Sequence, residues 1–188
     1  MENLNQKWFL FINSFATKNH TLDFLMIMIA KSLPYFFIAL LLYLWFTNKK
    51  NEALFAGFST SLGVGINLAI GLFYFHNRPF MDNLGVGLLF HKAENSFPSD
   101  HTTFVLAISL MLLTFKTTKI LGVVTTIFAL WCGVARIYLG VHYPFDIIGS
   151  IFVSSIAVIT ITILKSRFLN LNRLIISILI KKDYNGKI

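Results

Sequence analysis

Three short polar segments interrupt long apolar stretches of the chain, and their side chains are suited to phosphoryl transfer. The first contains Arg78, the second is 98–101 with the sequence Pro-Ser-Asp-His, and the third runs from Arg136 through His142 to Asp146. Guanidinium groups clamp phosphoryl oxygens, and a helix start offers backbone N–H groups to an anion. A histidine oriented by a nearby carboxylate has the logic of an activated nucleophile or base. These residue types therefore predict a phosphoryl-transfer site.

The sequence around these segments is typical of a membrane protein. Of its 188 residues, 56% are hydrophobic and only 13% are charged, which excludes an ordinary soluble domain. Apolar runs that could cross about 30 Å of hydrocarbon as helices lie near 22–46, 53–75, 101–115, 120–138 and 144–164. These runs are continuously apolar, whereas barrel strands alternate polar and apolar residues. We therefore expect an all-α integral membrane protein, a helical bundle of about five to six transmembrane helices in a single domain over residues 1–188.

The two ends of the chain differ from these spans. Leu4, Trp8, Phe11 and Phe15 recur at helical spacing among polar residues. This pattern predicts either an amphipathic helix at the membrane interface or a sixth, half-buried helix, and the sequence does not separate the two. Residues 168–180 form a short apolar run that contains an arginine, which favours a second interfacial helix over a span.

Basic residues indicate how the spans are oriented. The net charge is +8, and most of the excess lies around residues 49–50, around 116–119 and after residue 164. Short basic loops are retained in the cytoplasm, next to anionic lipid headgroups. Alternating span directions then place all three polar segments on the opposite face. This convergence favours one site at the outer membrane–water boundary, and nothing in the sequence resembles a nucleic-acid-binding motif.

Each polar residue also has a purely structural interpretation. Arg78 and Arg136 lie at membrane boundaries, where arginines often reach lipid phosphate without a catalytic role. Ser99 or Asp100 can simply cap the following helix. Two arginines on a face otherwise poor in cations, together with a histidine and a carboxylate in one short segment, favour the catalytic interpretation.

The three segments resemble the signature motifs of the type 2 phosphatidic acid phosphatase superfamily, which also contains vanadium haloperoxidases. The similarity covers about residues 67–150, in the order and spacing of Arg78-Pro79, Pro98 to His101, and Arg136 with His142 and Asp146. Within the superfamily, segments 75–80, 96–103 and 140–144 are most similar to the bacitracin-resistance type of undecaprenyl-diphosphate phosphatase.

The resemblance implies a role for each motif residue. His142 would be the nucleophile that forms a phosphohistidine, Asp146 its orienting partner, and His101 the general acid that protonates the leaving phosphate. The group that holds the transferred phosphoryl would comprise Arg78, Ser99, Asp100 through its backbone, and Arg136. No metal or other cofactor is then required, because arginines and helix N–H groups supply the positive field.

The chain departs from the broad family pattern at three positions. Gly71 stands where many members have a lysine, Asp100 where many have a glycine, and Ala135 where a serine is common. One hypothesis is that another cation replaces the lysine, with Lys31 in the first span as the main candidate, because a lysine inside a membrane is costly.

Other charged residues offer weaker candidates. Lys92 and His76 are further cations that could replace the missing lysine, and Glu94 could bind the second histidine or repel phosphate. An ordinary charged loop residue is the alternative for Glu94. His91 matches no motif and is expected to be an exposed loop residue.

The expected activity follows from the resemblance and from the expected location of the site. The chain would remove the terminal phosphate of undecaprenyl diphosphate, which regenerates undecaprenyl phosphate for cell-wall synthesis and gives bacitracin resistance. Its partners would be the lipid diphosphate and the lipids of the bacterial cytoplasmic membrane, with the active site on the extracytoplasmic side. The alternatives are a phosphatase for phosphatidate, phosphatidylglycerophosphate or a lipid A precursor, and a nonenzymatic flippase; a haloperoxidase fits a lipid-embedded chain least.

Overall fold

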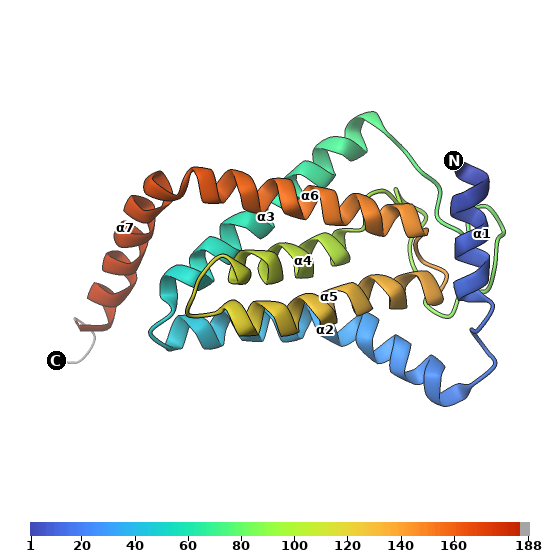
Figure 1. Ribbon diagram of the computed structural model, residues 1–188, viewed down its shortest axis with the longest axis horizontal. Coiled ribbons are helices and arrows are strands. Elements are labelled where there is room, and N and C mark those ends of the chain that lie inside the picture. The colour runs from blue at the N-terminus through green and yellow to red at the C-terminus, as the bar shows by residue number, and fades with distance from the viewer. Residues whose placement is uncertain (185–188) are drawn as a thin grey trace.

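The computed structural model describes residues 1–184, and all regular secondary structure in that part of the chain is helical. Figure 1 shows an elongated bundle with a short helix across one end and a tilted helix at the other. The helices, in chain order, are α1 (Glu2–Asn13), α2 (His20–Phe46), α3 (Lys50–Phe73), α4 (Asp100–Leu113), α5 (Lys119–Tyr138), α6 (Pro144–Ile163) and α7 (Lys165–Tyr184).

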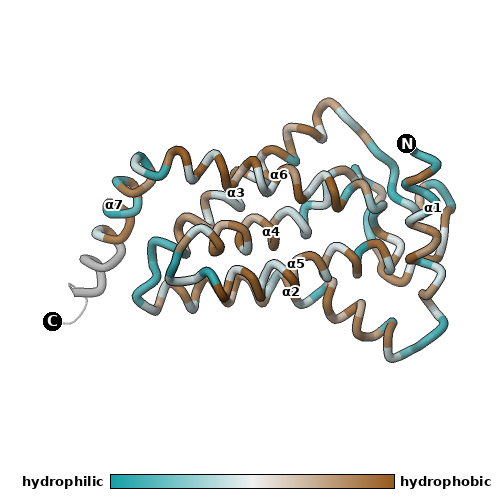
Figure 2. Tube along the Cα trace, in the orientation of Figure 1, coloured by the Kyte–Doolittle hydropathy of each residue, from teal (hydrophilic) through white to brown (hydrophobic). Residues whose placement is uncertain are grey.

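Four helices are long and apolar enough to cross a membrane, namely α2, α3, α5 and α6. Their bounds agree with the predicted spans to within a few residues. Figure 2 shows hydrophobic residues along these helices and hydrophilic ones in the connections at both ends of the bundle. The prediction of an all-α membrane bundle is confirmed.

The central helix α4 lies within one or two residues of the predicted run 101–115 but is too short to count among the spanning helices. It has only 14 residues and ends at Leu113, so it rises about 21 Å, less than the hydrocarbon thickness. It packs against α2, α3, α5 and α6, and most of its residues are buried. A helix enclosed by other helices is shielded from lipid along its length, so its length is not set by the bilayer.

Close helix contacts fix α4 in this central position. A Cβ added at Gly122 of α5 would lie 2.6 Å from the backbone nitrogen of Leu113, so only glycine allows the two backbones to approach this closely. At the other end of α5, a Cβ on Gly133 would meet Ile147 of α6 at 2.6 Å. Small residues are the usual way for membrane helices to pack tightly.

The first helix is short and amphipathic, as both alternatives from the sequence require. With 12 residues, α1 is too short to span, and it lies across the end of the bundle (Figure 1). Phe9 is fully buried and its ring lies 5.3 Å from that of Tyr143, whereas Trp8 and Phe11 remain exposed. Asn13 donates to the carbonyl of Tyr138 at 2.8 Å. This helix is therefore too short to span a membrane, and its buried face packs against the loop between α5 and α6.

Candidate active site

The three polar segments come together at the end of the bundle that carries α1. They are the connection 74–99, the start of α4, and the end of α5 with the start of α6 (Figure 1). The predicted convergence on one face of the bundle is therefore observed. Arg78 does not end a span, because α3 stops at Phe73 and Arg78 lies in the following connection.

The local fold around His142 follows from the residues that start α6. Pro144 occupies the first helical turn, where proline is favoured because its missing N–H needs no partner. Asp146 lies in that turn, and its Oδ2 accepts the backbone N–H of Tyr143 at 2.8 Å. The carboxylate is therefore fixed one helical turn from His142, whose Nδ1 lies 3.4 Å from the same Oδ2.

Ser96 connects His142 to Asp146, and the sequence analysis missed this role. Its hydroxyl makes a short hydrogen bond to Oδ2 of Asp146 and lies 3.2 Å from Nδ1 of His142. Since the hydroxyl donates its own proton to the carboxylate, its oxygen accepts a hydrogen bond from the N–H at Nδ1 of His142. Ser96 lies within the second motif segment, 96–103, so the signal was present in the sequence.

Arg78 fixes the other nitrogen of His142. Its Nη1 lies 3.2 Å from Nε2 of the imidazole, and a guanidinium can only donate, so Nε2 accepts and carries its lone pair. Burial and the positive charges of Arg136 and Arg78 lower the pKa of His142 to about 3, against the opposing effect of Asp146. The imidazole is therefore neutral near pH 7, with its lone pair at Nε2, where it accepts the hydrogen bond from Arg78.

Arg78 is itself held by backbone oxygens. The side chain is only 4% exposed. It donates to the carbonyls of Glu94 at 3.2 Å, Asn95 at 3.0 Å and Val141 at 3.2 Å. This burial excludes the interpretation that Arg78 simply reaches lipid headgroups.

Arg136, near the end of α5, is buried with unused hydrogen-bond donors. It is 2% exposed, and neither Nε nor Nη2 has a partner within the described part of the chain. A buried charged donor without a partner is costly, usually by several kcal/mol. An arrangement of this kind is retained where an anionic ligand completes the hydrogen bonds.

The start of α4 leaves Ser99 free of a capping role. Ser99 is the N-cap residue, yet its side chain makes no capping hydrogen bond. The hydroxyl instead accepts from Thr102 at 3.1 Å. The first N–H groups of a helix lack intrahelical acceptors, so this end of α4 presents donors to an anion.

Asp100 and His101, the first two residues of α4, lie at the edges of hollows in the surface. The Asp100 carboxylate accepts a hydrogen bond from Asn67 of α3 at 2.8 Å. Because an ionised carboxylate repels phosphate, its backbone is the part suited to anion binding. His101 lines a cavity of about 450 Å³ together with Arg136.

His76 is a second histidine on Asp146. Its Nδ1 donates to Oδ1 of that carboxylate at 3.1 Å, and its Nε2 lies 3.6 Å from Glu2 of α1. The hydrogen bond to Asp146 raises the pKa of His76 although burial opposes the shift. His76 thus contacts the carboxylate that orients His142, which local sequence did not indicate.

Of the remaining candidates, Glu94 contacts an arginine of the site, whereas Lys31 and His91 line a cavity beside it. Glu94 lies 3.5 Å from Arg78 and 3.3 Å from His91, so it pairs with an arginine of the site. Lys31 of α2 and His91 line the same cavity as His101. We expected His91 to be an exposed loop residue. This is wrong, because only 18% of its side chain is exposed.

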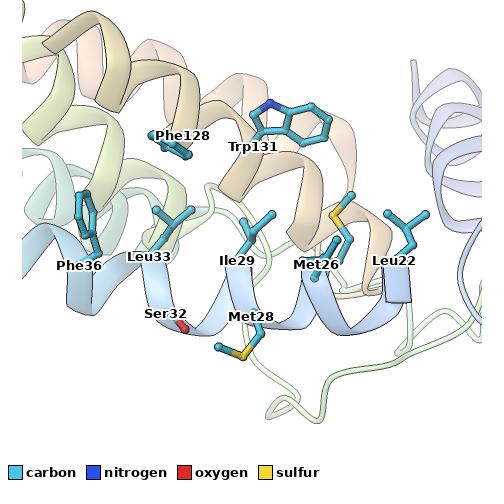
Figure 3. Close-up of a pocket in the computed structure, with 10 residues that line it drawn as sticks. Leu22, Met26, Met28, Ile29, Ser32, Leu33, Phe36, Phe128 and Trp131 are labelled. Carbon is cyan, nitrogen blue, oxygen red and sulfur yellow. The ribbon is translucent and has the colours of Figure 1, made fainter. Parts of the chain in front are cut away.

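An apolar hollow on a different face of α2 contains none of these residues. Figure 3 shows Leu22, Met26, Ile29 and Leu33 pointing from α2 toward α5. Trp131 of α5 closes the other side of this hollow of about 550 Å³. Its walls are suited to hydrocarbon and separate from the polar site.

Comparison with known proteins agrees with this geometry. The model of the PAP2 superfamily matches residues 52–170, more than half of the chain. Undecaprenyl-diphosphatase BcrC of Bacillus subtilis (strain 168) is 38% identical over 156 residues, covering 81% of this chain and 80% of that protein. Putative undecaprenyl-diphosphatase YbjG of Escherichia coli (strain K12) is 31% identical over 172 residues, covering 87% and 84%.

A solved structure shows the same architecture. The crystal structure of Aquifex aeolicus LpxE matches with a TM-score of 0.73 and 25% identity, covering 85% of this chain and 94% of that one. The resemblance stated from the motifs is thereby confirmed, and the chain belongs to the PAP2 superfamily.

Proposed function

We propose that this chain is a membrane phosphatase that hydrolyses undecaprenyl diphosphate to undecaprenyl phosphate. The observation that carries the proposal is the pairing of a neutral His142, its Nε2 lone pair held at Arg78, with the buried and unpartnered donors of Arg136. A nucleophile beside buried cationic donors is suited to phosphoryl transfer. The substrate assignment rests on the similarity to BcrC of Bacillus subtilis.

The proposed first step transfers the terminal phosphoryl group to the enzyme. Nε2 of His142 uses its lone pair to form a bond to the terminal phosphorus, and the bond from phosphorus to the bridging oxygen breaks. The oxygen keeps that electron pair and takes a proton from His101, so undecaprenyl phosphate leaves. Burial and the charge of Arg136 lower the pKa of His101 to about 4, and the negative charge of the bound diphosphate favours the protonated imidazole that this step needs. Arg78, Arg136 and Ser99 hold the phosphoryl oxygens while charge builds on them.

The second step releases phosphate. The now neutral His101 accepts a proton from water, the water oxygen bonds to phosphorus, and the bond from phosphorus to Nε2 breaks. Throughout the cycle the proton on Nδ1 of His142 stays directed at Ser96 and the Asp146 carboxylate, which stabilise the positive imidazole of the phosphohistidine.

Location and metal independence belong to the same proposal. The basic connections lie at the opposite end of the bundle from the site. By the positive-inside rule, this supports a site on the extracytoplasmic side of a bacterial cytoplasmic membrane. Among residues 1–178, whose side chains the structure describes, no group of three His, Cys, Asp or Glu side chains is arranged to hold a metal ion. Metal-free catalysis stays a prediction, and chelation tests it.

The test is phosphate release by the purified protein in detergent, with undecaprenyl diphosphate as substrate and EDTA present. We expect turnover in the presence of EDTA and its loss in a folded His142→Ala variant. Phosphatidate and phosphatidylglycerophosphate are assayed in parallel, because another lipid phosphatase would use the same residues. Higher kcat/KM on one of those lipids would overturn the substrate assignment, and tight binding without any turnover would indicate a carrier.

A further inference from the structure

We propose that the cavity between α2 and the connection 74–99 binds the phosphate that stays on the lipid, with Lys31 and His91 as its ligands. The cavity has a volume of about 450 Å³. The proposal rests on the proposed function and extends it, since it assigns a subsite that makes the enzyme selective for diphosphates over monophosphates.

The cavity begins where the leaving group must depart. His101 and Arg136 form part of its wall, and both also belong to the proposed reaction site. A lipid diphosphate whose terminal phosphoryl lies at Arg136, with its bridging oxygen at His101, extends its second phosphate beyond them. Lys31 and His91 complete that wall.

The charges around the cavity favour an anion. Lys31 takes part in none of the ion pairs found among the described residues. His91 faces Arg78 and Arg136, and also Glu94, whose Oε1 lies 3.3 Å from its Nδ1. Half of the Glu94 side chain is exposed, so an entering phosphate can displace this carboxylate into water. A phosphate would then accept from His91 and pair with Lys31.

A neighbouring hollow provides for the hydrocarbon. It measures about 280 Å³ and shares Pro34, Ile38 and His101 with the charged cavity. It adds Val64, Phe104 and Asp100, so its walls are mostly apolar. Apolar walls directly beside a cationic cavity are what a phosphate esterified to a hydrocarbon chain requires.

The chemistry gives the subsite a consequence for selectivity. When a diphosphate reacts, negative charge develops on the departing phosphate, and a cation beside it stabilises the transition state. A phosphate monoester expels an alcohol instead and places no phosphate in this cavity. Lys31 would therefore accelerate hydrolysis of the diphosphate only. A lysine that contacts the transferred phosphoryl group would instead accelerate hydrolysis of both the diphosphate and the monoester.

The test compares farnesyl diphosphate with farnesyl phosphate, which share one hydrocarbon tail. In Lys31→Met we expect kcat/KM for the diphosphate to fall about 10-fold, equal to about 1.4 kcal/mol, with the monophosphate unchanged. His91→Gln should show a smaller loss of the same kind. Lys7→Met is the matched control, an exposed lysine of α1 at the same end of the bundle that does not line the cavity. Equal losses on both substrates, or no loss, would overturn the proposal.

A binding measurement separates this proposal from the proposed function. In the His142→Ala background, the Kd for farnesyl diphosphate is measured with Lys31 present and with Lys31→Met. We expect about 10-fold weaker binding in the double variant and no change for farnesyl phosphate. An unchanged Kd for the diphosphate would overturn the subsite. If the wild-type protein hydrolyses neither substrate, the proposed function fails, and this comparison still decides whether the cavity binds the retained phosphate.

Discussion

Removal of the Ser96 hydroxyl should impair the nucleophile without abolishing it. The hydroxyl links Nδ1 of His142, at 3.2 Å, to Oδ2 of Asp146. In Ser96→Ala, the direct contact from Nδ1 to that carboxylate starts at 3.4 Å, longer than a good hydrogen bond. A hydrogen bond to a charged group contributes about 1.5–3 kcal/mol, so kcat/KM should fall about 10- to 150-fold.

Asp146→Asn sets the scale for this loss. A neutral amide in that place favours the wrong imidazole tautomer, for which about 10⁴-fold is expected from the catalytic triads of other enzymes. The kcat/KM of Ser96→Ala should therefore be well above that of Asp146→Asn. Asp146 keeps its hydrogen bond from the backbone N–H of Tyr143 and its contact with His76, so the carboxylate stays in place.

The assay is steady-state phosphate release, combined with a double-mutant cycle. Because Ser96 acts through Asp146, the double variant should be no slower than Asp146→Asn alone, a strong departure from additivity. Ser155→Ala is the control, since that hydroxyl bonds only to the Ile151 carbonyl in α6 and its loss should leave kcat/KM unchanged. Full activity in Ser96→Ala, or additive losses, would refute the relay.

Three further predictions test the site and its supports. Arg136→Gln should lower kcat/KM at least about 100-fold while the Tm stays or rises, because a buried unpartnered charge is removed; a lower Tm would contradict this. His142 has a folded pKa of about 3, below the unfolded value of about 6.5. Acidification from about pH 7.5 to about pH 5.5 should therefore lower the free energy of unfolding of the wild type by about 1.4 kcal/mol, a loss that His142→Asn does not show. An equal decrease in both proteins, measured by denaturation at the two pH values, would refute this. Gly140→Ala should lower both Tm and kcat/KM, because φ is +77° and a Cβ would lie 2.5 Å from the Val86 carbonyl. Gly57→Ala, with open space around its Cβ, should not.

Hydrophobic runs predicted the spans well, because a lipid-facing helix must be apolar over its whole length. The same signal counted α4 as a further span, although its 14 residues are too few to cross the bilayer. Hydropathy does not distinguish a helix that faces lipid from one enclosed by other helices. The role of the first helix also needed the structure, since Phe9 is buried by Tyr143, which lies far away in sequence.

The motif residues were predictable because their chemistry is distinctive and they lie at the ends of apolar runs. Their supports were harder to predict, because the 74–99 connection folds through long-range contacts. Asn95, for example, accepts the backbone N–H of His76 at 2.9 Å. This fold carries His76 to Asp146 and His91 to the cavity of Lys31, and no local pattern encodes either placement.

The most direct test of the account is to trap the intermediate. Wild-type protein is mixed with undecaprenyl diphosphate labelled in its terminal phosphate and quenched in alkali, where phosphohistidine survives. The account predicts label on Nε2 of His142, formed and lost at rates that match turnover, and no label in His142→Ala. Turnover by the wild type without label on His142, or label on another residue, would contradict it.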